Sequence, residues 1–195
     1  MAQNSRVLVY IACSFDGFIA GPGDDLSWLP GADANAAPEA QEAGTAPADT
    51  GAVGFEAFMS RVGALLMGRR SYEVVQGFAG SWPYGERPVL VATHRPLQPI
   101  VPQVRAVQGE MTDLLAQARE AAGDRDVYLD GGNLIRQALD ADLVDEMIVT
   151  MVPVLLGAGY PLFAGVRKRH RLEFVRHQRY GRELLQVELR PAAKK

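Results

Sequence analysis

The hydrophobic pattern of this chain alternates between short continuous apolar runs and longer stretches with helical spacing. The run from Val7 to Cys13 is rich in β-branched residues and predicts a central strand buried on both faces. Further strands are predicted at 64–67, 88–92, 104–107, 127–129, 146–154, 171–178 and 183–190. The last two of these are joined near Tyr180, and this short connection favours an antiparallel hairpin.

Helical spacing of apolar residues separates several of these runs. Residues 133–140 gather their apolar side chains on one face, and similar spacing occurs at 55–62, 71–75 and 111–122. Ser71 is predicted to cap the helix at 71–75. Helices alternate with strands early, and strands cluster late. This order predicts an α/β fold with a mixed, mostly parallel central sheet, helices on both faces and antiparallel strands at its C-terminal edge.

The length of 195 residues predicts one domain, residues 1–195. Residues 30–52 are rich in Ala, Pro, Gly and acids and contain almost no large apolar side chain. This composition predicts a long loop insertion, and loops of this length in compact domains are usually functional or mobile.

Charge and composition narrow the class of protein. The net charge of −3 argues against a nucleic-acid-binding protein, which usually presents a basic face. The basic run at 167–171 is interpreted as a solvated loop or strand edge. Cys13 is the one cysteine, so no intramolecular disulfide forms, and with three histidines the chain is not expected to bind metal. No apolar stretch reaches membrane-spanning length, so we expect a cytoplasmic protein without a membrane partner.

Three predicted strands end in residues suited to binding phosphate. Glycine permits close approach of the backbone, guanidinium groups pair with phosphate, and the N-terminus of a helix attracts anions. The G-x-G-x-x-G and G-x-x-x-x-G-K-[ST] signatures are absent, so the common Rossmann and P-loop sites are not indicated. The three strand ends are Gly68-Arg69-Arg70-Ser71, Thr93-His94-Arg95 and Asp130-Gly131-Gly132-Asn133.

The residues around two of these strand ends resemble the dihydrofolate reductase-like superfamily. The segment 64–73 resembles the strand–Gly-Arg-x-[ST]-aromatic-Glu segment of dihydrofolate reductases, and 127–132 resembles their second cofactor segment. Residues 14–20, 141–146 and 153–157 are closer to the riboflavin-biosynthesis reductase, the RibD C-terminal domain type. The resemblance implies a three-layer α/β/α fold of the dihydrofolate reductase type. It also implies an NADPH-dependent reductase acting on a small-molecule substrate, and a homodimer.

The resemblance also implies where NADPH would bind. Nicotinamide would lie near Ala12 and Ile19, and the segment from Gly131 to Leu134 would hold the pyrophosphate. The strand end at 68–71 would hold phosphate, and the strand end at 93–95 would lie near the adenosine 2′-phosphate. Arginines at both strand ends favour NADPH over NADH, since a guanidinium pairs bidentately with the additional phosphate.

Four acids are candidates for the substrate side of such a site. Asp16 and Asp130 match acids of the riboflavin-type reductases and are the predicted catalytic residues, although each is also explained by a turn or a helix cap. Asp33 and Glu56 are candidate substrate-binding residues, and Thr150 matches a threonine that supports the folate pocket. Each of these three is also consistent with an ordinary loop, helix or strand residue.

The substrate itself stays open. The Asp-Asp-Pro segment of the riboflavin reductase is absent after Ser71. The expectation is reduction of a small heterocyclic substrate, as in the 5-amino-6-(5-phosphoribosylamino)uracil reductase domain. One alternative is a dihydrofolate reductase proper, in which Asp33 and Thr150 would meet in one pocket. Another is a nucleotide- or flavin-binding module without catalysis.

Overall fold

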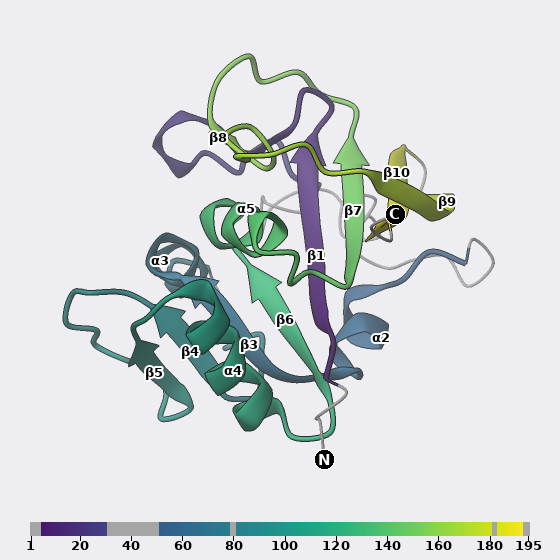
Figure 1. Cartoon of the computed structure of the whole chain (residues 1–195). Coiled ribbons are helices and arrows are strands. Elements are labelled where there is room, and N and C mark those ends of the chain that lie inside the picture. The colour runs from purple at the N-terminus through teal and green to yellow at the C-terminus, as the bar shows by residue number, and fades with distance from the viewer. Residues whose placement is uncertain (1–4, 31–50, 79–80, 181–182, 193–195) are drawn as a thin grey trace.

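An eight-stranded sheet forms the centre of the computed structural model, which describes residues 5–30, 51–78, 81–180 and 183–192. The strand order is β5-β4-β3-β6-β1-β7-β10-β9 (Figure 1). The strands are β1 Val7–Ser14, β3 Val62–Gly68, β4 Val89–Ala92, β5 Val104–Val107, β6 Asp126–Asp130, β7 Glu146–Val152, β9 Leu172–Tyr180 and β10 Leu184–Pro191.

The sheet is parallel from β5 to β7 and antiparallel at its C-terminal edge. Parallel pairing joins β1 to both β6 and β7, and joins β3 to both β4 and β6. The strands β10 and β9 then form the predicted antiparallel hairpin, with β10 paired to β7. A separate two-stranded sheet joins β2, Phe18–Ala20, to β8, Tyr160–Pro161. The predicted mixed, mostly parallel sheet is therefore confirmed.

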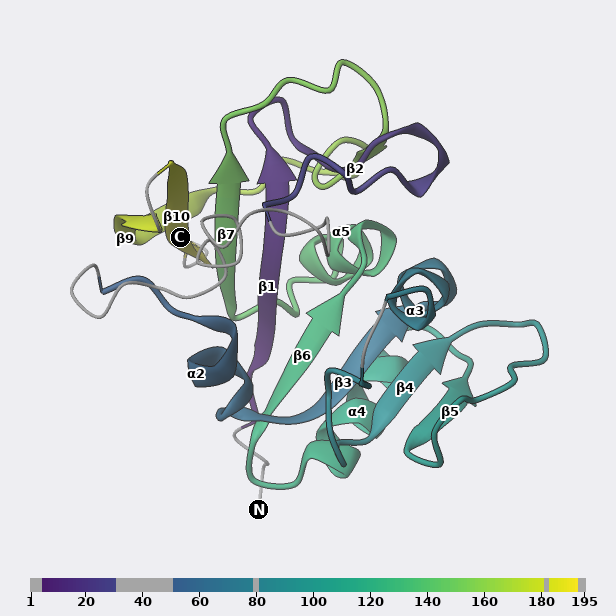
Figure 2. The same cartoon turned by 180° about the vertical axis from the view of Figure 1, so that it is seen from behind.

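Helices cover both faces of this sheet. Figures 1 and 2 show the two faces of the sheet. Helices α4 and α5 lie in front of it in Figure 1, and α2 lies in front of it in Figure 2. No helix among the described residues is both long and apolar enough to cross a bilayer. The helices are α2 Phe55–Met59, α3 Arg69–Gln76, α4 Met111–Ala122 and α5 Gly132–Asp140, with a 3₁₀ turn, η1, at Pro22–Asp24.

The continuous apolar runs are explained by burial on both faces of the sheet. Along β3, Ala64 and Leu66 enter the core beneath α4 and α5. Leu65 and Met67 point the other way, into the core that contains Phe58. Successive side chains of a strand face opposite sides, so a strand with a hydrophobic layer on each side needs apolar residues throughout.

Three predicted boundaries are corrected by the structure. The helix at 55–62 ends at Met59, because Val62 pairs with β6 as the first residue of β3. The predicted strand at 146–154 ends at Val152, before a proline that has no N–H to donate. Ser71 is not a helix cap, since α3 begins at Arg69 with extended Gly68 at the cap position.

Candidate active site

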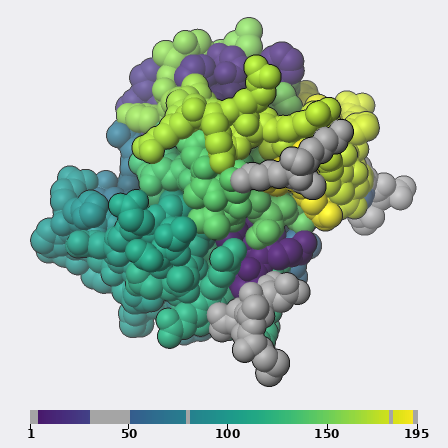
Figure 3. Space-filling view, in the orientation of Figure 1, coloured from purple at the N-terminus to yellow at the C-terminus, as the bar shows by residue number. Residues whose placement is uncertain are grey.

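A cavity of about 640 Å³ lies at the edge of the sheet where the parallel strands end. Its walls come from β1, β3 and β6, from the first turns of α3 and α5, and from the β2–β8 pair. Figure 3 shows residues near β2 and β8 gathered at one end of the molecule. Ligands of open α/β sheets bind beyond the carboxyl ends of the strands. The predicted residues that line this cavity are Ala12, Ile19, Gly68, Arg69, Arg70, Ser71, Asp130, Gly131, Gly132, Asn133 and Leu134.

Two helix N-termini meet at one end of the cavity, which we call the glycine–arginine end (Gly68 to Ser71, Gly131 to Asn133 and Arg136). Gly131 has φ +96°, and a Cβ added there would lie 2.6 Å from Ser71 Oγ. A Cβ on Gly132 would lie 3.0 Å from the Pro161 carbonyl oxygen. The starts of α3 and α5 thus approach each other closely, with unpaired backbone N–H groups that favour an anion. The geometry fits phosphate groups of a nucleotide.

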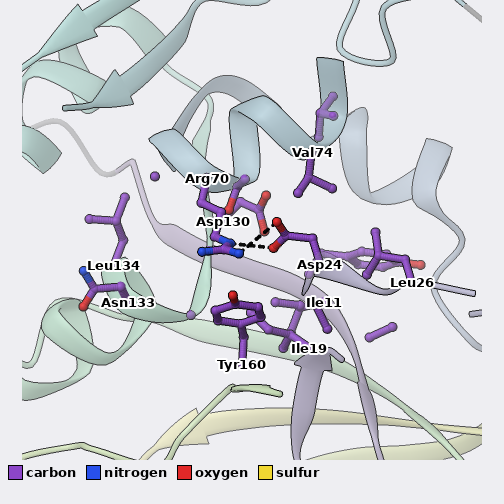
Figure 4. A pocket seen from close by; sticks show the side chains of 18 of the residues that line it. Ile11, Ile19, Asp24, Leu26, Arg70, Val74, Asp130, Asn133, Leu134 and Tyr160 are labelled. Carbon is purple, nitrogen blue, oxygen red and sulfur yellow. Dashed lines mark hydrogen bonds and ion pairs between the residues drawn. The ribbon is translucent and has the colours of Figure 1, made fainter. Parts of the chain in front are cut away.

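Arg70 spans the mouth of this end (Figure 4). Its guanidinium donates to both carboxylate oxygens of Asp24, at 2.5 and 2.9 Å, and lies 4.0 Å from the centre of the Tyr160 ring. The bond to Asp24 raises the pKa of Arg70 further. Arg70 therefore ties α3 to η1 and β8, and an incoming anion can replace Asp24 in the exposed ion pair.

The other two cavity arginines also bond to the protein. Arg69 Nε donates to Glu73 at 2.6 Å, while its Nη1 donates to the Pro96 carbonyl at 2.9 Å. Arg136 Nη1 donates to the Pro161 carbonyl at 2.5 Å. Both side chains thereby hold neighbouring loops against the helix starts and place positive charge beside them.

The strand end at 93–95 lies beside the cavity rather than in its wall. A second hollow of about 620 Å³ is lined by Arg95 together with Arg70 and Glu73. Thr93 is buried and accepts a hydrogen bond from the Arg95 N–H at 3.2 Å, which shapes the turn. His94 is exposed and lines neither hollow. Of this strand end, Arg95 is the residue positioned to meet a phosphate outside the main cavity.

Another part of the cavity wall is aromatic, and we call Tyr10, Phe55, Tyr84, Tyr128 and Asp130 the aromatic end. Asp130 joins it to the glycine–arginine end at Gly131. Tyr10 lies 5.9 Å from Phe55, and Tyr84 lies 6.5 Å from Tyr128, between ring centroids. Tyr128 donates its hydroxyl to the Tyr10 carbonyl at 2.8 Å. Burial, and then the nearby Asp130 carboxylate, raise the pKa of both Tyr84 and Tyr128. These hydroxyls stay neutral, so this wall offers flat apolar surface.

Asp130 is the acid that the structure places in the cavity wall. It ends β6 directly before Gly131, and its side chain is partly accessible from the cavity. Burial raises the pKa of its carboxyl from 3.8 to about 6, although the backbone N–H of Gly131 acts in the opposite direction. A carboxyl with a pKa near the working pH can hold a proton and release it.

Asp16, the other predicted catalytic acid, does not line the cavity. Its carboxylate accepts hydrogen bonds from the Ser14 hydroxyl at 2.6 Å and from the backbone N–H of Gly157 at 2.7 Å. The Ser14 bond is the largest cause of the lowered pKa of Asp16, ahead of the backbone N–H groups of Gly157 and Leu156. Asp16 therefore joins the turn after β1 to the loop after β7, and its predicted catalytic role has no support from this geometry.

Of the three predicted substrate-binding residues, the two that the structure describes do not line the cavity. Glu56 is exposed on α2, outside the cavity lining. Thr150 is buried within β7 and receives a long contact, 3.4 Å, from Gln186 Nε2. Asp33 lies outside the described residues. No group of three or more potential metal ligands occurs in the part of the chain that is described.

Several cavity residues were missed by the sequence reasoning. The aromatic side chains come from β1, α2, the segment before β4, and β6, one from each. A single aromatic residue in an apolar run has no local feature that distinguishes a cavity position from a core position. Asp24 and Tyr160 were missed for the same reason, because their importance depends on contact with Arg70 across the fold.

The sheet order and the position of the cavity define a protein of the dihydrofolate reductase-like α/β class. Solved structures with this fold include a reductase-type protein, the diaminohydroxyphosphoribosylaminopyrimidine deaminase/5-amino-6-(5-phosphoribosylamino)uracil reductase from Thermotoga maritima. That match has TM-score 0.63 and 17% identity, over 96% of this chain and 57% of that one.

The chain belongs to the RibD C-terminal domain family, whose model matches residues 5–186. A structure from Shewanella sp. PV-4, named as a riboflavin biosynthesis protein, is 31% identical with TM-score 0.76, covering 96% of this chain and 99% of that one. A relative in Bacillus subtilis (strain 168), the uncharacterized protein YwjB, is 25% identical over 90% of this chain and 92% of its own.

Proposed function

We propose that this protein is an NADPH-dependent reductase of a small heterocyclic substrate. The observation that carries this proposal is one cavity that combines two facing helix N-termini at its glycine–arginine end with an acid of raised pKa at its aromatic end. The first feature suits the phosphates of a dinucleotide, and the second suits proton transfer. Family membership supports the combination.

The residues at the glycine–arginine end would hold the cofactor. The N–H groups at the starts of α3 and α5 would bind the pyrophosphate, while Arg70 and Arg95 face the hollow suited to a further phosphate. A cofactor phosphate would replace the Asp24 carboxylate, so Arg70 would have an anionic partner both before and after the cofactor binds. Arginine recognises a terminal phosphate bidentately, which supports NADPH over NADH.

The residues at the aromatic end would orient the substrate and supply the proton. A bound nicotinamide supplies a hydride to an electrophilic carbon of the substrate. Ile19 and Ala12 form the apolar wall where the ring would lie. Protonated Asp130 would then give its proton to the adjoining heteroatom, leaving a carboxylate that is reprotonated from water. The reaction balances as hydride plus proton, giving the reduced substrate and NADP⁺.

Titration of the purified protein with NADPH and with NADH, followed by nicotinamide fluorescence, tests the cofactor assignment. We expect saturable binding, with an affinity for NADPH at least about tenfold higher than for NADH. One bidentate contact between an arginine and the additional phosphate is enough for a difference of this size. Binding of neither nucleotide would refute the proposal. The alternative of a dihydrofolate reductase proper needs Thr150 and Asp33 in one pocket. Thr150 does not line the cavity, and Asp33 lies outside the described residues.

A further inference from the structure

The segment that carries Phe55 into the cavity wall is held by a side chain from outside the cavity. Phe55 is the first residue of α2, a helix of five residues. Two residues earlier, the Val53 N–H donates to Gln186 Oε1 at 2.7 Å, and the Val53 carbonyl oxygen accepts from Gln186 Nε2 at 3.1 Å. One amide side chain therefore pairs with Val53 as the backbone of a neighbouring strand would.

The position of the Gln186 side chain is set by the central sheet. Gln186 is 5% exposed and belongs to β10, the strand that pairs with β7. Its Nε2 also lies 3.4 Å from the Thr150 hydroxyl on β7. A buried side chain in close packing has little freedom to move, and its hydrogen bonds restrict it further. Val53 is thereby fixed relative to the sheet.

Tyr10 joins the same point to the cavity. Its hydroxyl donates to the Val53 carbonyl oxygen at 3.0 Å, while its ring lines the cavity with its centroid 5.9 Å from that of Phe55. Burial, and then Tyr180, raise the pKa of the Tyr10 hydroxyl, so this hydroxyl stays a donor. Two aromatic residues of the cavity wall therefore depend on the placement of one backbone residue behind it.

The residues just before Val53 pack on the same C-terminal hairpin. Ala52 contacts the hydrophobic cluster that includes Tyr180 of β9. Gly51 has φ +65°, and a Cβ added there would lie 2.5 Å from Nε2 of Gln178, which also belongs to β9. The chain therefore approaches Phe55 over the surface of the β9–β10 hairpin, and neither strand of this hairpin lines the cavity.

We propose that Gln186 is a positioning residue for the substrate, because it places Phe55 in the aromatic end through Val53. This role rests on the reductase function proposed above and belongs to the substrate side of that site. Without the Gln186 amide, the Val53 N–H and carbonyl lose these bonds, and the Phe55 ring shifts within the wall on which a flat substrate would stack. The starts of α3 and α5 are not part of this arrangement, so NADPH affinity should not change.

Fluorine NMR of the full chain with 4-fluorophenylalanine at position 55 tests the positioning directly. We expect one resonance in the native protein and a shifted or split resonance in Gln186→Met, which keeps the length of the side chain but cannot donate. Gln117→Met is the matched control, because Gln117 lies on α4, which packs on the other face of the sheet from α2. The control should keep the native resonance.

Gln186→Glu is the second variant, in case Gln186→Met does not unfold cooperatively on heating. At pH 8 its carboxylate still accepts from the Val53 N–H but cannot donate to the Val53 carbonyl oxygen, so the resonance should shift here too. A native resonance in either variant, once folded, would overturn the proposal.

Steady-state kinetics connect the position of Phe55 to the substrate. The test substrate is 5-amino-6-(5-phosphoribosylamino)uracil, the pyrimidine named for the Thermotoga maritima enzyme. Gln186→Met should raise its KM about tenfold and leave kcat within about threefold, because a displaced wall weakens binding of substrate and transition state alike. A merely structural defect would lower the amount of active protein and leave KM unchanged. A native KM in Gln186→Met would therefore count against the proposal.

The positioning role and the reductase function fail in different ways. If the native protein does not bind NADPH, the proposed function fails, while the fluorine resonance still shows whether Gln186 positions Phe55. If the native protein binds NADPH but does not reduce the uracil compound, the fluorine resonance alone decides the positioning role. If the native protein is an active reductase and Gln186→Met keeps the native resonance, the function stands and the role of Gln186 is wrong.

Discussion

The two ends of the cavity are built by different means. Backbone N–H groups, glycines and arginines form the glycine–arginine end, and they come from just two strand–helix junctions. The aromatic end consists of side-chain surface assembled from four separate segments around one acid. Local junctions can therefore supply binding of a common cofactor, whereas specificity for a substrate depends on residues that only the complete fold brings together.

The largest expected effect is on kcat, and it comes from substitution of Asp130 at the aromatic end. Asp130→Asn removes the proton donor and should lower kcat about 100- to 1,000-fold, the range of general acid catalysis, with NADPH affinity unchanged. In the native protein, kcat should fall as pH rises through about 6, because the proposed mechanism uses the protonated carboxyl of Asp130 as the acid. Steady-state kinetics across pH 5–8 would measure both effects, and an Asp130→Asn variant with native kcat would contradict the assignment.

The next prediction concerns the glycine–arginine end. Gly131→Ala forces a side chain into φ +96° and against Ser71 Oγ, so NADPH affinity should fall about 10- to 100-fold as the helix start is displaced. Gly123→Ala is the control, because Gly123 also has positive φ, +63°, with open space around it at the C-terminus of α4. Fluorescence titration should show a weakened NADPH complex in the first variant and a native one in the second.

Asp130 should also set the pH dependence of stability. Its pKa is higher in the folded protein, about 6 against 3.8. Its contribution to the free energy of unfolding is therefore fully present below pH 4 and is lost as the pH rises to about 6. The difference between these two pH values amounts to up to ~3 kcal/mol. Asp130→Asn should consequently unfold at higher temperature than the native protein at pH 8, and this gain should vanish at pH 4. Thermal unfolding at both pH values measures it, and lower stability of the variant at pH 8 would contradict the raised pKa.

Substitutions of Arg70 and of Asp24 should change the affinity for NADPH in opposite directions. Arg70→Gln removes a cation at the mouth and should weaken NADPH binding about tenfold, with a smaller effect on NADH. Asp24→Asn releases Arg70 from its ion pair and should tighten NADPH binding about two- to threefold, as expected for an exposed pair. Both affinities follow from the same titration, and weakening by Asp24→Asn would show that the ion pair positions Arg70 instead of competing with phosphate.

The smallest effect is expected at Asp16. Because its carboxylate binds the loop after β7 and does not line the cavity, Asp16→Asn should leave kcat within about threefold of native. The variant should unfold at a lower temperature, since an amide accepts less well from two backbone N–H groups. A hundredfold loss of kcat in a folded Asp16→Asn variant would restore the catalytic interpretation.

Much of the fold and the glycine–arginine end could be predicted from sequence because their signals are local. Buried strands such as β3 are continuously apolar, and glycines and arginines directly follow the strands they serve. Asp16 and Asp130 looked alike, each an acid beside a glycine after a strand. The acids differ in what folds against them, since backbone N–H groups surround Asp16 while aromatic rings surround Asp130. That difference is tertiary, and no local pattern records it.

The position of β1 in the sheet affects how the chain folds during synthesis. This strand is made well before its two neighbours, β6 and β7, which lie more than a hundred residues later in the sequence. While the chain is being synthesised, this apolar strand therefore has no partner until about residue 130 has emerged, and lacks its second partner until about residue 152. Long-range parallel pairing of this kind slows folding and prolongs exposure to aggregation. Truncation after α5 would deprive β1 of one neighbour and the cavity of its β8 wall.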